Sequence, residues 1–277
     1  MTTEPILVVG ATGKTGRRVT SLLRGRGADV RAASRRAPTP FDWYDTATWE
    51  PAVRGAVAAY LVDSQGSDAP AQLREFGELA RAAGVRRLVL LSSRDWAVSG
   101  GEEYLTGERA VQESGVEWTI LRATWFAQNF SEDPLLADQV LAGELRLPTG
   151  QGLEPFIDAD DIAEVAAATL VEDGHAGRIY ELSGPRLLTF GTAIDEIARA
   201  TGRDIRYVPV TPEEHAAHLL GRGEDRAFVD LVNTLFSWIR DGHNAHLSDG
   251  VRQVLGRPPR DFTEYVTTTA TTGAWNP

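Results

Sequence analysis

The sequence predicts an α/β protein with a doubly wound parallel Rossmann sheet and a smaller, mostly helical C-terminal lobe. Two observations lead to this prediction. Four apolar residues (6–9) precede three glycines at three-residue spacing and then an amphipathic segment, which is the order strand, turn, helix. Short apolar runs then alternate with helical patterns as far as residue 121, and this alternation is typical of parallel sheets with right-handed crossovers.

Apolar runs and the residues that punctuate them define the other elements. Gly84, Gly115 and Gly202 close three helices. Asp160 or Asp161 is placed to cap a fourth, which favours a structural role for these carboxylates. The expected strands are 6–9, 29–35, 41–43, 56–62, 87–91, 116–121, 178–182 and 205–208, and the expected helices are 17–24, 47–53, 69–83, 102–113, 160–170 and 190–200, with 211–270 mostly helical.

We expect two domains. Residues 1–142 form the Rossmann domain and 143–277 form a smaller substrate lobe, with segments returning to the Rossmann sheet. No internal repeat or low-complexity linker separates them, so the lobe is expected to fold onto the Rossmann domain rather than form a separate module.

Composition narrows the classes of partner. The 277 residues carry a formal net charge of −11, with 42% hydrophobic and 24% charged residues. This content predicts a packed core, and the acidic charge disfavours nucleic acid and anionic membranes as partners. The absence of cysteine excludes disulfides and thiol chemistry. With no membrane-spanning run and no signal-peptide pattern, we expect a soluble cytoplasmic protein. A monomer or homodimer with a small-molecule substrate is expected.

The glycines at positions 10, 13 and 16 predict a dinucleotide site. Gly10 permits the tight turn after the strand, Gly13 lets a pyrophosphate approach the backbone, and Gly16 lets the helix pack closely. The N–H groups at the helix N-terminus then face the anion. The alternative is a strand–turn–helix without a ligand, which the spacing and the position near residue 1 disfavour.

The end of the second strand predicts a preference for NADP over NAD. An NAD site would carry Asp or Glu here for the ribose 2′-hydroxyl, whereas this chain has Ser34, Arg35 and Arg36. A guanidinium suits a 2′-phosphate, and we place Arg35 ahead of Arg36. The alternative is a solvated charge pair on a surface turn.

Further candidate residues follow the later strands. Loops at the carboxyl edge of such a sheet line the ligand crevice, and the loops at 63–66 and 92–96 lie there. Past the sixth strand come aromatic and polar residues that suit a flat substrate, although packing between the lobes explains them equally well. These residues are Trp125, Phe126, Gln128, Asn129 and Phe130.

Two His-x-x-His spacings occur, at His215/His218 and at His243/His246. Histidines at helical i, i+3 spacing can bind a metal, but no further ligand completes a recognisable site. We therefore expect surface histidines and no metal.

Short segments spread over nearly the full chain carry a resemblance to a known family. They are Gly10-x-x-Gly13-x-x-Gly16, Ser34-Arg35, Leu91-Ser92-Ser93, Gly107-Glu108-Arg109, Thr119-Ile120-Leu121-Arg122-x-x-Trp125-Phe126-x-x-Asn129-Phe130, Asp161-Ile162-Ala163, Leu182-Ser183-Gly184-Pro185, Gly256-Arg257-Pro258-Pro259 and Gly273-Ala274-Trp275. The pattern resembles the NmrA-like branch of the atypical short-chain dehydrogenase/reductases. Within that branch, residues 41–49 are most similar to festuclavine dehydrogenase-like reductases of ergot-alkaloid pathways and their bacterial relatives.

The resemblance implies an NADP-binding Rossmann domain, a C-terminal substrate lobe and, in many members, hydride transfer to an imine, enone, quinone or similar acceptor. By position, it assigns the phosphates to Thr12, Gly13, Lys14, Thr15 and Arg35, the adenine to Asp42 and Trp43, and the ribose and nicotinamide to Val62, Asp63, Ser92 and Thr124.

The chain departs from the superfamily in its catalytic residues. Typical short-chain dehydrogenases use Tyr-x-x-x-Lys, in which the lysine lowers the pKa of the phenol. Here Tyr104 is followed four residues later by Glu108, and the only lysine, Lys14, lies in the glycine loop. The remaining catalytic candidates are Tyr104, Ser92 and Ser93. An iminium acceptor needs only hydride, which would make a missing acid harmless.

Three functions are consistent with these observations. The first is an NADPH-dependent reductase of a small, flat organic acceptor in secondary metabolism, with the substrate between Ser92, Ser93, Tyr104 and the segment 125–130. The second is a non-catalytic NADP(H)-sensing protein that binds a partner. The third is a cyclase or isomerase in which the nucleotide is structural.

Overall fold

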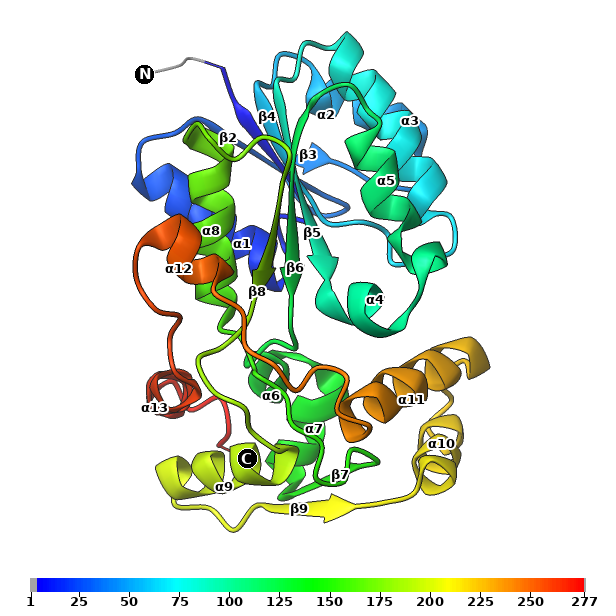
Figure 1. The fold of residues 1–277 in the computed structure, drawn as a ribbon, viewed down its shortest axis with the longest axis vertical. Helices are drawn as coiled ribbons and strands as arrows, with labels where there is room; N and C mark the ends of the chain where they lie inside the picture. The colour runs from blue at the N-terminus through cyan, green and yellow to red at the C-terminus, as the bar shows by residue number, and fades with distance from the viewer. Residues whose placement is uncertain (1–3, 277) are drawn as a thin grey trace. The chain divides into compact units, whose positions relative to one another are not determined.

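The computed structural model describes residues 4–276 and divides the chain into two compact units (Figure 1). The chain enters unit 2 after Ala123, earlier than the expected boundary at residue 142, and then returns to unit 1 twice. Segments returning to the Rossmann sheet were part of the expectation. Unit 1 comprises Met1–Ala123, Ala159–Leu182 and Asp249–Pro258, and unit 2 comprises Thr124–Asp158, Ser183–Ser248 and Pro259–Pro277.

Unit 1 is built on a seven-stranded parallel sheet in the order β3-β2-β1-β4-β5-β6-β8, which confirms the predicted Rossmann architecture. The central strands β1 and β4 are buried along their whole length, as expected for a parallel sheet covered on both faces. The strands are β1 (Ile6–Val9), β2 (Val30–Ser34), β3 (Thr39–Pro40), β4 (Ala58–Leu61), β5 (Arg87–Ser93), β6 (Glu117–Ala123) and β8 (Arg178–Leu182).

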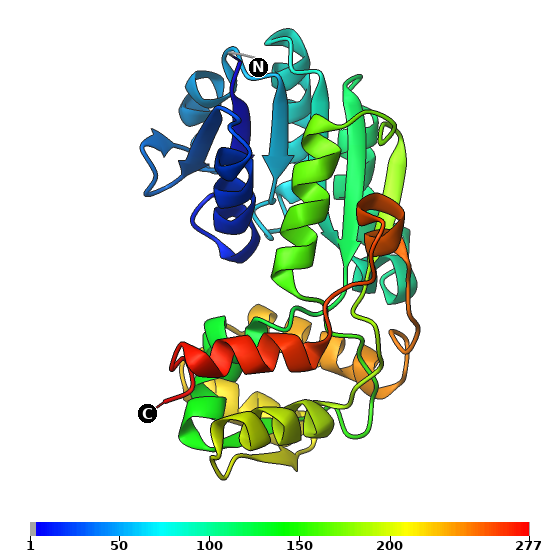
Figure 2. The same cartoon turned by 90° about the vertical axis from the view of Figure 1, so that its left-hand side faces the viewer.

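Helices cover both faces of this sheet, as Figures 1 and 2 show. Helices α1 and α8 lie side by side on one face, and α2, α3 and α5 bury their apolar sides on the other. The helices of unit 1 are α1 (Lys14–Gly25), α2 (Trp49–Val53), α3 (Ala69–Ala82), α4 (Arg94–Ser99), α5 (Thr106–Gln112), α8 (Ala159–Val171) and α12 (Gly250–Leu255), with 3-10 turns η1 (Thr46–Thr48) and η2 (Glu102–Leu105).

The third strand lies earlier in the chain than expected. Strand β3 is Thr39–Pro40, whereas Phe41 and Trp43 turn inward and pack with Trp49 and Phe76. The prediction of a strand at 41–43 was therefore wrong. Phe41 and Trp43 are instead part of an aromatic cluster in the core on the face of the sheet that α2, α3 and α5 cover. Helix α4 was also not predicted, because its six residues are too few to show a helical period.

Unit 2 is mostly helical, with one short parallel pair of strands, β7 and β9. Its core is rich in aromatic side chains, among them Phe130, Phe156, Phe190, Phe236 and Phe262. The elements are α6 (Asn129–Glu132), α7 (Pro134–Ala142), β7 (Glu144–Leu147), α9 (Phe190–Thr201), β9 (Arg206–Pro209), α10 (Pro212–Gly221), α11 (Arg226–Arg240) and α13 (Phe262–Thr271).

We expected Asp160 or Asp161 to be the N-cap residue of helix α8. The helix begins at Ala159, however, so both residues lie within its first turn. They form ion pairs instead. Asp160 accepts a hydrogen bond from Arg18 Nε at 2.7 Å, and the buried Asp161 accepts one from Arg257 Nη2 at 2.7 Å. These carboxylates therefore tie α8 to the other elements of unit 1, which keeps the predicted structural role but changes its form.

The histidines divide between surface and interior. His218, His243 and His246 are exposed, but His215 is only 2% exposed, so its predicted surface position was wrong. Its Nδ1 lies 2.6 Å from Asn233 Oδ1, and burial lowers its pKa. Within residues 4–276, no three His, Asp or Glu side chains are grouped so as to hold a metal ion. None of the helices in this range combines the length and apolar character that crossing a membrane requires.

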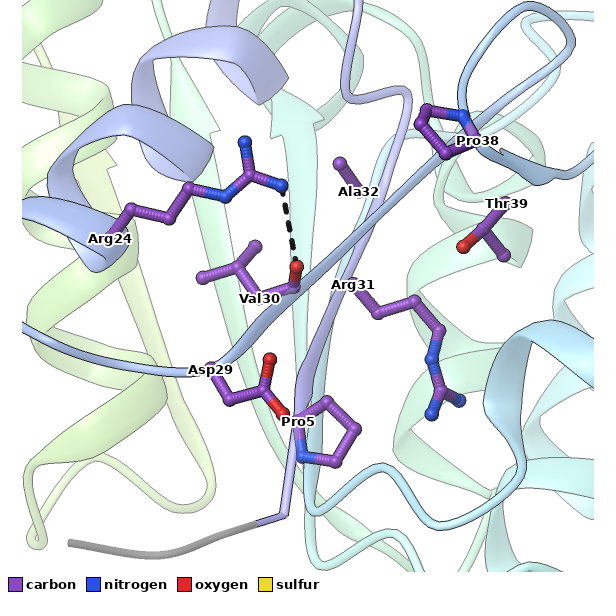
Figure 3. A pocket seen from close by; sticks show the side chains of 8 residues that line it. All are labelled: Pro5, Arg24, Asp29, Val30, Arg31, Ala32, Pro38 and Thr39. Atoms are coloured by element: carbon purple, nitrogen blue, oxygen red, sulfur yellow. Dashed lines mark hydrogen bonds between the residues drawn. The ribbon is translucent and has the colours of Figure 1, made fainter.

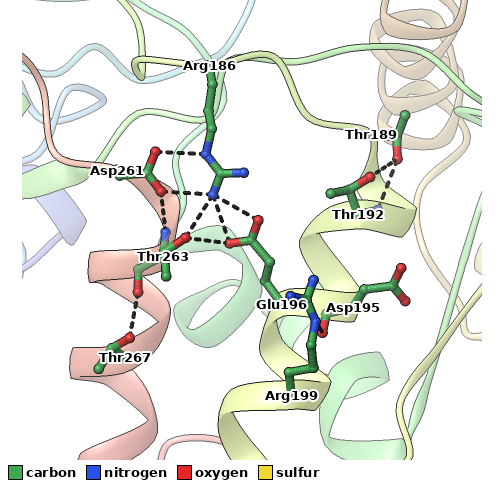
Figure 4. Close-up of polar contacts among 9 residues, drawn as sticks. All are labelled: Arg186, Thr189, Thr192, Asp195, Glu196, Arg199, Asp261, Thr263 and Thr267. Atoms are coloured by element: carbon green, nitrogen blue, oxygen red, sulfur yellow. Dashed lines mark hydrogen bonds and ion pairs between the residues drawn. The ribbon is translucent and has the colours of Figure 1, made fainter.

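A charge network around Arg186 ties the loop after β8 to two helices of unit 2 (Figure 4). The guanidinium donates to both carboxylate oxygens of Asp261, at 2.7 and 2.8 Å, and to Glu196 Oε2 at 2.9 Å. Asp261 also caps α13 by accepting from Thr263 N. The hydrogen bond from Arg186 holds the pKa of Asp261 below its ordinary value.

This network predicts an acid-sensitive part of the stability. Replacing Arg186→Met should lower the free energy of unfolding by about 2 kcal/mol at pH 7, since two carboxylates lose charged hydrogen bonds. The folded-state pKa of Asp261 is depressed, so its contribution is present above about pH 4 and is lost as the pH falls through the folded value. Urea unfolding should therefore show that wild type and variant converge at low pH.

The matched control is Arg226→Met, which removes the exposed ion pair with Asp230 on α11. An exposed pair of this kind contributes less than about 1 kcal/mol. Equal losses in the two variants, or a gap between wild type and Arg186→Met that persists at low pH, would contradict this role of the network.

Candidate cofactor and active site

The loop between β1 and α1 has the geometry of an anion-binding turn. Gly10 has φ +75°, and its carbonyl accepts from Gly13 N at 2.9 Å. A Cβ on Gly16 would lie 2.2 Å from that same carbonyl oxygen, and a Cβ on Gly13 would lie 3.2 Å from it. Only glycine lets α1 approach the strand this closely. The N-cap is Gly13, which brings no side-chain acceptor to the first-turn N–H groups.

The two threonine side chains of this loop differ in their exposure to solvent. Thr12 is exposed beside the turn, whereas Thr15 is 4% exposed and its hydroxyl accepts from Tyr60 Oη at 2.9 Å. The Thr15 side chain therefore faces the sheet, and the predicted role of Thr15 at the phosphates stays a prediction that would fall to its backbone N–H. Lys14 is half-buried at the first position of α1.

Arg35 and Arg36 are both exposed at the end of β2. Ser34 is nearly buried, and its Oγ accepts from Arg36 N at 3.3 Å, so this hydroxyl stabilises the turn. Ala11 N donates to Ala33 O, which places the glycine loop directly beside this strand end. A positively charged side chain is thus available next to the predicted pyrophosphate position.

The segment after β3 places Tyr44, and not Trp43, at the surface. Trp43 is 8% exposed, packs in the aromatic cluster, and donates from Nε1 to Val62 O at 2.8 Å. Its ring lies edge-to-face with Phe41, Trp49 and Phe76, and its place beside the adenine stays a prediction. Tyr44 is 66% exposed, and Asp42 Oδ1 accepts from its backbone N–H. Three aromatic residues within four positions were the signal that could have drawn attention to Tyr44.

The loop after β4 is close to the glycine loop and carries backbone strain. A Cβ on Gly10 would lie 3.3 Å from Val62 Cβ, so these two loops are neighbours. Gln65 has φ +57°, the sole left-handed non-glycine residue in the described part of the chain. Asp63 Oδ1 accepts from Gln65 N at 3.0 Å, and burial raises the pKa of Asp63. Strained residues of this kind gather at functional sites.

Ser92, near the carboxyl end of β5, is hydrogen-bonded to an ion pair formed by Glu108 and Arg122. Ser92 is opposite Arg122 in the register of β5 and β6, so both side chains leave the same face of the sheet. Helix α5 brings Glu108, which is 4% exposed, onto that face. The Glu108 carboxylate accepts from Ser92 Oγ at 2.7 Å, from Arg122 Nε at 3.0 Å and from Arg122 Nη2 at 2.7 Å.

The other two catalytic candidates have contacts of their own. Ser93 caps α4: its hydroxyl accepts from Asp95 N at 3.2 Å and donates to Asp95 Oδ2 at 3.0 Å. Tyr104 is 42% exposed, and its ring is stacked on Trp96 with 5.1 Å between centroids. Unit 1 therefore brings Ser92, Ser93 and Tyr104 to the elements around α4, with both serine protons directed at carboxylates.

The candidates in unit 2 are more deeply packed than expected. Thr124 is 2% exposed and donates to Pro155 O at 2.8 Å, and Phe130 is completely buried in the core of unit 2. Neither side chain has surface for a ligand, so their assignments to cofactor and substrate are corrected. Trp125 is half-buried and stacked on Phe236 with 5.2 Å between centroids. Phe126 and Asn129 are also half-buried.

A surface hollow of about 280 Å³ lies elsewhere on unit 1 (Figure 3). It is lined by Asp29 and Val30 near the amino end of β2, with Arg24 donating to Val30 O at 3.4 Å. None of the predicted site residues lines it. The predicted cofactor residues gather instead at the carboxyl ends of the strands, where parallel α/β sheets bind ligands.

The fold and the glycine turn define a nucleotide-binding Rossmann protein. The chain matches the NAD(P)H-binding family over residues 10–173. It is 32% identical to festuclavine synthase II of Penicillium roqueforti, over 93% of this chain and 95% of that protein. It therefore belongs to the NAD(P)H-binding family.

Solved structures share the fold. The NADPH-dependent quinone oxidoreductase QOR2 of Escherichia coli, complexed with NADPH, has a TM-score of 0.81 and 23% identity, covering 95% of this chain and 99% of that one. NmrA, a negative transcriptional regulator, has a TM-score of 0.72 and 20% identity, covering 99% and 97%. The glycine turn of this chain fits the pyrophosphate of such a cofactor, since Gly13 brings no side chain to the N-terminus of α1 and Gly16 lets that helix lie against Gly10.

The two loop glycines predict different defects. Gly16→Ala drives a Cβ against backbone, which cannot yield as a flexible side chain would, so the thermal midpoint should fall. Gly13→Ala meets only a contact of 3.2 Å, so the fold should survive while NADPH binding weakens at least tenfold. Thermal unfolding and a fluorescence titration with NADPH check both. Full NADPH affinity in Gly13→Ala would show that this loop does not hold the pyrophosphate.

Proposed function

We propose that the protein is an NADPH-dependent reductase that transfers hydride to a small, flat organic acceptor of the imine or iminium class. The observation that carries this proposal is the direction of the serine protons at the carboxyl end of β5: Ser92 donates to Glu108 and Ser93 donates to Asp95. When bound, NADPH supplies the hydride. The chain's own residues then need to bind and orient the acceptor.

The choice of NADPH over NADH rests on Arg35. The end of β2 carries exposed guanidinium groups and no carboxylate at positions 34–36. A 2′-phosphate forms charge-assisted, often bidentate hydrogen bonds with arginine, each contributing roughly 1.5–3 kcal/mol. That range corresponds to about one to two orders of magnitude in affinity.

The acceptor class follows from proton supply. A quinone or carbonyl acceptor takes a hydride and also needs a proton at oxygen, whereas an iminium ion already carries positive charge and needs only the hydride. Position 108, four residues after Tyr104, holds glutamate and not lysine. With both serine protons directed at carboxylates, an acceptor that requires no proton suits this site. A relative named festuclavine synthase supports an alkaloid-like acceptor, and the name of the quinone oxidoreductase supports a flat one.

A regulatory function is the second candidate. The fold is shared with NmrA, a negative transcriptional regulator, and that likeness covers almost the whole chain. A sensor would bind NADP(H) without consuming it. The half-buried Trp125, stacked on Phe236, favours the enzyme, because it provides an aromatic surface in the substrate lobe.

Replacing each of the two arginines, Arg35 and Arg36, with alanine tests the cofactor preference. Arg35→Ala should reduce the preference for NADPH over NADH by about ten- to a hundredfold, since the 2′-phosphate loses its guanidinium. Arg36→Ala is the matched control and should change the ratio of the two dissociation constants much less. Fluorescence titration with both cofactors measures this ratio. An unchanged ratio in Arg35→Ala would place 2′-phosphate recognition elsewhere.

Acceptor screening tests the proposed activity. Purified protein with NADPH should reduce 3,4-dihydroisoquinoline, held at a pH where its nitrogen is protonated, faster than menadione or cyclohexenone, with one NADPH oxidised per product. Tyr104→Phe should leave iminium turnover within about threefold, because that reaction needs no acid. Tight NADPH binding without oxidation by any acceptor would instead favour the regulator.

A further inference from the structure

The pair Glu108–Arg122 has a feature that a merely structural ion pair does not require. Both groups are withdrawn from water, with side chains 4% and 16% exposed, and they contact each other through three hydrogen bonds. Yet Glu108 Oε1 also accepts from Ser92, at 2.7 Å. The pair is thus coupled to Ser92, the last residue but one of β5, at the predicted reaction site.

This coupling fixes the chemical character of Ser92. A hydroxyl has one proton and two lone pairs, and here the proton is directed at the carboxylate. Ser92 is only half-buried, and we take its oxygen as the atom that meets a ligand. What the ligand meets is a hydrogen-bond acceptor made more electron-rich by the anion behind it. Arg122 balances the charge of Glu108, and Glu181, opposite Arg122 in the register of β6 and β8, adds a second carboxylate to the surroundings of Arg122.

We propose that Glu108 and Arg122 are positioning residues that hold Ser92 as a hydrogen-bond acceptor and thereby select acceptor molecules that carry a donating N–H⁺. This inference rests on the proposed hydride transfer. In the reaction, the C=N bond of the iminium gains the hydride at carbon, its π electrons become the nitrogen lone pair, and NADPH becomes NADP⁺. No proton is transferred, and the nitrogen keeps its N–H hydrogen bond to Ser92 Oγ throughout the reaction.

The same geometry disfavours neutral acceptors. A carbonyl or quinone oxygen would face the lone pairs of the Ser92 hydroxyl. It could not accept the hydroxyl proton of Ser92, because that proton is donated to Glu108. Releasing that proton should therefore raise activity toward a quinone while lowering it toward an iminium. A change of opposite sign for two substrates is an effect that loss of folding cannot produce.

The test replaces the pair as a unit. Removing Glu108 alone would leave Arg122 buried and unbalanced, whereas an apolar pair of similar volume is often tolerated. The variants are Glu108→Leu/Arg122→Met, Ser92→Ala and the triple replacement. The control is Glu50→Gln/Arg54→Met, which removes an exposed ion pair at α2 that is not part of the hydrogen bonds around Glu108 and Arg122. All are compared in kcat/KM for protonated 3,4-dihydroisoquinoline and for menadione, and in thermal midpoint.

The expected result is a fall of roughly tenfold or more in the iminium-to-quinone ratio of kcat/KM for the pair variant, the size of one charge-assisted hydrogen bond. In the Ser92→Ala background the pair replacement should have no further effect on that ratio, because it acts through Ser92. Binding of protonated tetrahydroisoquinoline to the NADP⁺ complex should weaken in parallel, while the NADPH dissociation constant stays unchanged.

Three outcomes would overturn the inference. The ratio remains as in wild type; it changes by the same factor whether or not Ser92 is present; or both rates fall together with the thermal midpoint, which is the signature of a structural pair. A wild-type protein that binds NADPH and reduces neither acceptor would overturn the proposed function and this inference with it. That result is distinguishable, since it appears before any variant is made.

Discussion

The approach of α1 to β1 is the contact on which the site depends. Position 16 has no room for a Cβ, because the carbonyl oxygen of Gly10 would lie 2.2 Å away. With glycine there, the first turn of α1 points its N–H groups at the end of the sheet, next to the ends of β2 and β4. The remaining cofactor candidates in unit 1 depend on this turn, because it fixes where the pyrophosphate would lie in the predicted site.

A second constraint governs the chemistry beside it. In unit 1, the hydroxyls at the end of β5 are oriented by carboxylates, Glu108 for Ser92 and Asp95 for Ser93. The sheet register places Ser92 opposite Arg122, so the balancing charge is built into the strands themselves. Such a site offers lone pairs more readily than protons. This property is the basis of the proposal that the acceptor brings its own positive charge.

Local sequence was sufficient for the parts that depend on neighbouring residues. The buried strand at 6–9, the glycine turn and the long helix 69–82 follow from apolar period and glycine spacing. It was insufficient where burial depends on distant contacts. Trp43 lies in the core because Phe76, a residue of another element, packs on it, and His215 is buried through Asn233, eighteen positions away. The interleaved units likewise arise from the pairing of β6 with β8, which no local pattern specifies.

The most direct measurement is the fate of the hydride. NADPH carrying deuterium at both C4 positions is incubated with the protein and protonated 3,4-dihydroisoquinoline, and the amine product is analysed by mass spectrometry and NMR. The two forms that carry deuterium on only one face of C4 are then tested separately. The account predicts one deuterium at the former iminium carbon for each cofactor oxidised, from one face of NADPH only. Product without deuterium, or a bound cofactor that is never oxidised, would contradict it.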